Sequence, residues 1–212
     1  MTAPLSSEHG LTALPDHLHG FALTHMAMRR DARRLVAAAP TLSPAALRTV
    51  ADWWHEVRST IEWHHHSEDE LLWPELRRLV PGVAGAGAVL DGDHVALDEA
   101  MAEVSRTLGA GGAGLVATAG RFDALLHDHL RREEAVVFPA FTKGMTVAQY
   151  TTVESRVISS AGIGRLGFIL PWMFDGFSRR ETGRADATIP PPIRLLNTTV
   201  LRNRYRRRWG QW

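Results

Sequence analysis

The sequence predicts an all-α protein, an up-down-up-down four-helix bundle followed by a helical and irregular C-terminal extension. Apolar residues recur at spacings of three and four through residues 1–143. No sustained alternation of apolar and polar residues indicates a strand, and turn-forming residues gather in a few short segments. Long helices joined by short connections favour antiparallel neighbours. We therefore divide the chain into a bundle domain, 1–143, and an extension, 144–212.

Each bundle helix carries signals for its ends. Asp16 is a suitable cap for the first helix, and Pro40 follows its end. Pro44 suits the first position of the second helix, and Pro74 predicts an internal kink. The expected helices are 16–39, 43–79, about 91–108 and about 115–141, separated by glycine-rich segments at 80–87 and 109–114.

The composition restricts the chemistry. The chain has 212 residues, no cysteine and 11 histidines. Disulfides, thiolate metal sites and cysteine nucleophiles are excluded, so a metal must bind through nitrogen and oxygen. The first ten residues lack the basic and apolar segments of a secretory signal, and we expect a cytoplasmic protein.

The charge is divided unequally along the chain. Residues 1–143 hold 13 basic and 19 acidic side chains, whereas residues 144–212 hold 11 basic and 4 acidic ones. The overall net charge of +1 therefore hides an acidic bundle and a basic extension.

A weak internal repeat points to a metal site. The segment HHHSEDELLWP (64–74) aligns with HLRREEAVVFP (129–139), which pairs His64 with His129 and Glu68 with Glu133. One histidine lies upstream of each copy, His25 and His94 respectively. The pattern is a helix with histidine followed by a helix with His-x-x-x-Glu, twice over, and it predicts a two-metal site.

The four-residue spacing places each histidine and its glutamate on one face of a helix, so that each pair can bind a metal. A carboxylate can also bridge to a second ion. Mixed imidazole and carboxylate ligation suits iron or manganese, and an oxo or hydroxo bridge would leave each ion one open position. The predicted ligands are His25, His64, Glu68, His94, His129 and Glu133.

These residues resemble the hemerythrin-like, or HHE cation-binding, family over roughly residues 15–141. The resemblance implies a four-helix bundle holding two non-haem iron ions, with manganese or zinc as substitutes. Oxygen-carrying hemerythrin has a fifth histidine four residues after the third-helix histidine, where this chain has Asp98. The set of four histidines and two glutamates is more similar to bacterial iron-centre repair proteins and actinobacterial hemerythrin-like proteins.

This resemblance implies a protein that binds or reduces a small oxidant, namely oxygen, nitric oxide or hydrogen peroxide. One alternative is a diiron oxidase or oxygenase acting on an organic substrate held under the extension. The other is a sensor whose metal or redox state changes partner binding by the basic tail. Whether the protein is an enzyme stays open at this point.

Some assignments near the site keep alternatives. His65 and His66 also have acidic residues four positions on, but only His64 keeps the distance to proline seen in the second copy. Arg29 and Asp98 lie one turn after His25 and His94, where they could form an ion pair that orients ligands or simply pair at the surface. Asp98 could also be a ligand itself.

The remaining histidines, His9, His17, His19, His55 and His127, are expected to be solvated, to cap helices or to lie beside the site.

The extension is harder to interpret. Residues 146–161 predict a fifth helix, residues 162–177 are apolar but too interrupted to cross a bilayer, and Pro190–Pro192 predict an extended linker. We expect the extension to pack on the acidic bundle or at a homodimer interface, with peripheral membrane contact as the rival. No nucleic-acid motif is found.

Overall fold

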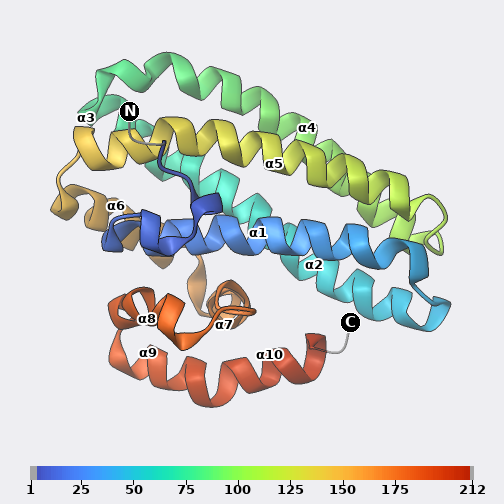
Figure 1. The fold of residues 1–212 in the computed structure, drawn as a ribbon. Helices are drawn as coiled ribbons and strands as arrows, with labels where there is room; N and C mark the ends of the chain where they lie inside the picture. Colours follow the sequence, from blue (N-terminus) through green and yellow to red (C-terminus); the bar gives the residue numbers. More distant parts are fainter. Residues whose placement is uncertain (1–3, 211–212) are drawn as a thin grey trace.

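The computed structural model describes residues 4–210, and it describes residues 84, 86–89, 91, 179 and 188 through their backbone only. The described residues contain no strand. The predicted all-α bundle with a helical extension is confirmed (Figure 1). Around the bundle, α5 packs against α1 and α4, and α4 packs against α2. The bundle segments are α1 (His19–Ala38), α2 (Pro44–Ser67), α3 (Trp73–Leu79), α4 (Ala84–Gly109) and α5 (Leu115–Pro139).

The kink predicted at Pro74 takes the form of a π-helical turn, Glu68–Leu72, between α2 and α3. Pro74 lies in the first turn of α3 and has no N–H with which to continue the helical hydrogen bonds. The N–H of Trp73 instead reaches back five residues to the carbonyl of Glu68. The helix widens where Glu68 faces the centre of the bundle. Such π-helical turns are frequent at functional sites.

The start of the third bundle helix was predicted too late. The structure begins α4 at Ala84, and the glycine-rich link shrinks to a 3₁₀ turn at Pro81–Val83. Glycine inside a helix costs about 1 kcal/mol. Val83 and Leu90 are nevertheless buried, and packing of these side chains supports the additional helical turns.

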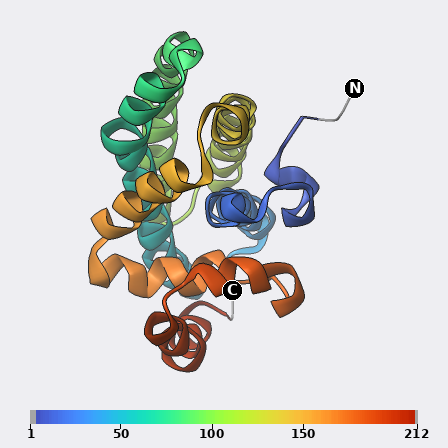
Figure 2. The ribbon, with the colours of Figure 1, turned by 90° about the vertical axis from the view of Figure 1, so that its left-hand side faces the viewer.

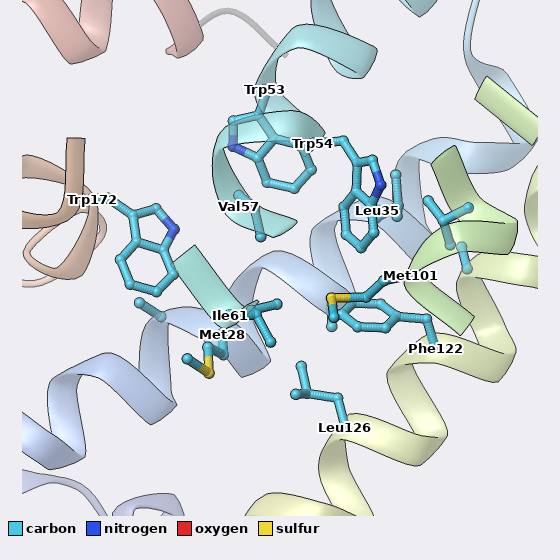
Figure 3. Close-up of a cluster of buried hydrophobic side chains, with 14 of the residues drawn as sticks. Met28, Leu35, Trp53, Trp54, Val57, Ile61, Met101, Phe122, Leu126 and Trp172 are labelled. Atoms are coloured by element: carbon cyan, nitrogen blue, oxygen red, sulfur yellow. The ribbon is translucent and has the colours of Figure 1, made fainter. Parts of the chain in front are cut away.

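Two apolar clusters fill the bundle, one toward each end. Along α1, for example, Ala22 and Leu23 belong to one cluster and Ala27 and Met28 to the other, with His25 between them. The same interruption occurs in α2, α4 and α5. Figure 3 shows the larger cluster, which includes Met28, Leu35, Trp53, Trp54, Val57, Ile61, Met101, Phe122, Leu126 and Trp172. A polar layer therefore separates two dry cores.

The extension lies beside the bundle rather than continuing it (Figures 1 and 2). Its α7 and α8 contact α1. Trp172 is fully buried, and its Nε1 donates a hydrogen bond to Asp31 Oδ2 at 2.6 Å. Arg30 donates to the carbonyls of Trp172 and Asp175 at 3.0 and 2.6 Å. The elements are α6 (Val147–Ser160), α7 (Gly162–Met173), α8 (Arg179–Thr188), α9 (Pro191–Leu196) and α10 (Arg202–Trp209).

The prediction of an extended linker at Pro190–Pro192 is wrong for Pro191 and Pro192. Pro190 has an extended backbone, but Pro191 and Pro192 occupy the first positions of α9. Those positions need no intrahelical N–H donor, so proline begins a helix there without losing a bond. A π-helical turn at Asn197–Leu201 joins α9 to α10. None of the described helices has the length and apolar character needed to cross a membrane.

Candidate metal centre

The polar layer in the bundle contains the residues chosen from the repeat. The helices α1, α2, α4 and α5 all contribute to it, and each of its residues is at most 8% exposed. The helical spacing of the two His-x-x-x-Glu segments turns each histidine and its glutamate to the same side. The layer contains His25 from α1, His64, His65 and Glu68 from α2 and its π turn, His94 from α4, and His129, Glu133 and Glu134 from α5.

The potential ligands form two groups. In one, His25, His64, Glu68 and Glu133 each offer an atom within 4.8 Å of the others. In the other, His65, His94 and His129 do the same. Every member of both groups is buried.

The two glutamates of the first group also lie near histidines of the second. Glu68 Oε1 is 3.0 Å from His64 Nε2, and its Oε2 is 4.0 Å from His94 Nε2. Glu133 Oε2 is 3.5 Å from His25 Nε2 and 3.6 Å from His129 Nε2. Each carboxylate therefore approaches one imidazole of each group. Two nitrogen and oxygen sites lie side by side, joined by two carboxylates.

A family model for the hemerythrin HHE cation-binding domain matches residues 16–146, more than half of the chain. The chain belongs to this family. The match ends one residue before α6, so the family domain contains the whole bundle and excludes the extension from α6 onward. No curated protein and no solved structure matches the chain. As a hemerythrin-like domain, the bundle is a metal-binding unit.

The orphaned polar atoms of the centre fit this family assignment. Both ring nitrogens of His65 and His129 are buried without a hydrogen-bond partner, and both oxygens of Glu68 and Glu133 are buried without a well-aligned one. Leaving such an atom unpaired costs about 1–3 kcal/mol. A coordinated cation would supply the missing partners. The donor set, all nitrogen and oxygen, fits divalent ions of the iron, manganese and zinc type.

Burial also sets the protonation of the centre. Removal from water raises the pKa of Glu68 to about 8, and it raises the pKa of Glu133 well above its ordinary value, with the neighbouring Glu68 adding to the effect. Burial lowers the pKa of His64 and brings the pKa of His129 down to about 2. These imidazoles are therefore neutral, and neutral imidazole is the form that binds metals.

Glu134, the residue after Glu133, holds His25 in place. Its Oε1 accepts hydrogen bonds from His25 Nδ1 at 2.9 Å and from Arg29 Nη1 at 2.7 Å. Both oxygens also accept bonds from Ser6 and Ser7 near the start of the chain. Because the carboxylate can only accept, the proton of His25 lies on Nδ1 and Nε2 faces the other ligands.

The sequence analysis kept His65 only as an alternative to His64, whereas the structure places both in the cluster. The repeat pairs His64 with His129, whereas the position of His65 corresponds to Leu130 in the second copy. In the structure, consecutive side chains on α2 point toward different neighbours. His64 lies against His25 of α1, and His65 stacks on His94 of α4 with ring centroids 4.1 Å apart. His64 and His65 face different helices because α2 contacts both α1 and α4.

The two residues predicted to orient ligands have different surroundings. Arg29 is buried and acts on His25 through Glu134, not through Asp98. Asp98 is exposed and belongs to neither ligand group. The buried face of α4 passes through His94, Leu97 and Met101, and Asp98 lies beside that face.

The other histidines lie outside the two groups. His66 and His55 are exposed, and His127 accepts a hydrogen bond from Arg33 near the surface. His19 is buried, and its Nε2 lies 3.3 Å from the carbonyl oxygen of Leu14.

Proposed function

We propose that this hemerythrin-like domain is a non-haem diiron protein that binds or reduces a small oxidant: oxygen, nitric oxide or hydrogen peroxide. The supporting observation is the pair of histidine groups joined by Glu68 and Glu133. Mixed imidazole and carboxylate ligands suit iron, and manganese and zinc are its competitors for the same donors.

In this proposal each group would hold one ion, and the two groups are unequal. His25 and His64 would supply imidazoles to one ion and three histidines to the other, and Glu68 and Glu133 would supply carboxylates. The group with fewer imidazoles leaves more room for an external ligand. A pair of ferrous ions supplies electrons and an open coordination position to a small oxidant. The three histidines of the second group are His65, His94 and His129.

Aromatic rings restrict what can reach the group with fewer imidazoles. The ring centroid of Phe21 lies 4.4 Å from that of His25 and 5.8 Å from that of His64. Phe138 packs edge-on against Phe21 at 5.9 Å. These rings, together with the apolar clusters on either side, surround this group with apolar side chains. This environment favours a small oxidant over an organic substrate.

The protein also fixes one proton. Glu134 keeps the proton of His25 on Nδ1, so that Nε2 stays available as a ligand. Arg29 and the hydroxyl of Ser7 in turn hold the carboxylate of Glu134.

The proposal is tested by anaerobic reconstitution with ferrous iron, followed by metal analysis and optical spectra after separate additions of oxygen, peroxide and nitric oxide. We expect the full chain to bind two irons, one per histidine group, and to change spectrum with at least one oxidant. Tighter binding of zinc or manganese, or iron that is inert to all three oxidants, would contradict the proposal.

Neighbouring histidines provide a matched pair of variants. His65→Gln removes an imidazole from the three-histidine group, and we expect it to lose about half of the bound iron. His66→Gln changes the next, exposed residue and should keep the wild-type iron content. Equal iron contents in the two variants would remove His65 from the site.

A further inference from the structure

The helix formed by α9, the π turn and α10 carries most of the positive charge of the extension. Residues 187–212 contain six arginines and no acidic residue. Arg204, Arg206, Arg207 and Arg208 are exposed. None of these four forms an ion pair with an acidic side chain in the described part of the chain. The acidic bundle therefore does not neutralise this arginine run.

The same helix exposes an unusual number of large apolar side chains. Nine large hydrophobic residues are exposed among the described residues, and four of them fall within the eight residues from Ile193 to Val200. Leu195 is 64% exposed and Val200 51%. Apolar groups concentrated in this way on a surface mark a contact site.

The opposite face of the helix is fixed to the body of the protein. Asn197, Tyr205 and Trp209 are buried, and Tyr205 packs against Phe168 of α7 with ring centroids 5.8 Å apart. The helix is thus held in one orientation. It forms the outermost layer of the molecule, on the side away from α4 and α5 (Figures 1 and 2).

The apolar and basic side chains occupy one side of this helix. Leu196, Val200, Arg204 and Arg208 follow one another at intervals of four. Val200, Arg204 and Arg208 also line one shallow hollow, together with Thr199, Asn203 and Arg207. The stripe is apolar toward α9 and basic toward the end of α10.

We propose that the α9–α10 helix docks the protein on the surface of an anionic lipid bilayer. The arginines would contact the negatively charged head groups, and Leu195, Leu196 and Val200 would enter the boundary between head groups and acyl chains. The exposed apolar residues favour a bilayer over a nucleic acid, because phosphate contacts alone need no apolar partner. The charge favours an anionic surface over a second copy, in which two arginine runs would repel.

The test is co-sedimentation of the full-length holoprotein with vesicles of phosphatidylcholine alone and of phosphatidylcholine mixed with phosphatidylglycerol. We expect binding to the mixed vesicles only, weakened by added salt. Arg204→Gln, Arg207→Gln and Arg208→Gln together should weaken binding about a hundred-fold, since each basic residue near the surface contributes about five-fold. Leu196→Gln with Val200→Gln should weaken binding about ten-fold or more through lost apolar insertion.

Matched controls use exposed residues of the same types on the bundle. Val116→Gln replaces a valine that is 56% exposed, and Arg48→Gln replaces an exposed arginine of α2. Both should bind mixed vesicles as the wild type does. Because every substituted side chain is exposed, bound metal and thermal unfolding should be unchanged in all variants.

Three results would overturn the proposal. The first is equal binding to both kinds of vesicle, or none to either. The second is binding that the leucine and valine changes leave intact and that a DNA duplex abolishes, which would indicate a nucleic-acid surface. The third is a dimer in solution that these variants dissociate. Each outcome is independent of the diiron proposal, which concerns residues of the bundle alone.

Discussion

Replacing Glu134 by glutamine tests how the protein holds His25. The carboxylate accepts hydrogen bonds on both oxygens: Oε1 from His25, Arg29 and the Ser7 hydroxyl, and Oε2 from Ser6 and the Ser7 N–H. Glutamine keeps the shape but replaces one oxygen by an NH₂ group, which can only donate. In either orientation of the amide, donors of the surrounding network therefore face another donor.

The magnitude follows from the burial of Arg29, which is 3% exposed and 2.7 Å from Glu134. Removing one partner of a buried ion pair costs about 3–5 kcal/mol. Glu8 lies 3.5 Å from Arg29, but its side chain is 40% exposed, so it is a weaker substitute partner for the arginine. We therefore expect the free energy of unfolding of the Glu134→Gln variant to fall by about 3 kcal/mol.

The same change should weaken metal binding at the group that contains His25. Loss of a carboxylate that orients a ligating histidine typically lowers metal affinity about 10- to 100-fold. The assay is metal titration together with chemical denaturation of the metal-free and metal-loaded forms. Glu134→Asp restores the charge and should recover part of both losses.

Glu103→Gln is the control, because Glu103 also accepts a short bond from an arginine, Arg121, but at the surface. Surface pairs contribute about 0–1 kcal/mol. If Glu134→Gln lost no more stability or metal affinity than Glu103→Gln, then the network of Glu134 would not position His25.

Three further predictions concern other parts of the molecule. Trp172→Ala removes the buried indole and its bond to Asp31, and should lower the free energy of unfolding by about 3–5 kcal/mol and expose α7–α10 to limited proteolysis; unchanged proteolysis would contradict the docking described above. Burial raises the pKa of Glu154, although the hydrogen bond from Tyr150 partly lowers it. The folded protein holds this proton more tightly than the unfolded chain, so the free energy of unfolding falls as the pH rises above the ordinary glutamate pKa. Glu154→Gln should consequently gain stability relative to wild type as the pH rises from about 4 to 7, and a difference independent of pH would refute this. Removing the metal should lower the thermal midpoint, because ligand at about a hundred times its Kd stabilises the fold by about 2.7 kcal/mol, and a midpoint insensitive to chelator would be inconsistent with a buried centre.

The repeat in the sequence was sufficient to find most of the polar layer. All six residues that it selects lie in the two ligand groups, because a spacing of four fixes which side chains share a helix face. His65 could not be found in this way. A repeat reports only what its two copies have in common, and the second copy has leucine at that position. One group has two histidines and the other three, because α2 contacts both α1 and α4 and gives one histidine to each group.

Local signals were weaker guides where packing decides the outcome. Glycines at 85 and 87 predicted a link, yet burial of Val83 and Leu90 extends α4 across them. Three consecutive prolines predicted an extended segment, yet Pro191 and Pro192 begin α9, because its first positions need no N–H donor. Contacts distant in sequence thus determine the backbone at the start of α4, and the local chemistry of proline determines it at the start of α9.

Helix α1 links the metal centre to the N-terminal turn and to the extension. Arg29 is bonded to Ser7 and Glu134, while Arg30 and Asp31 bind the backbone and the indole of α7. His25 lies one turn before these three consecutive residues. The group of His25 and His64 is therefore braced by the N-terminal turn on one side and by the extension on the other. Trp172 of α7, and Tyr205 and Trp209 of α10, lie in the same apolar cluster as Ala27 and Met28, which follow His25 on α1.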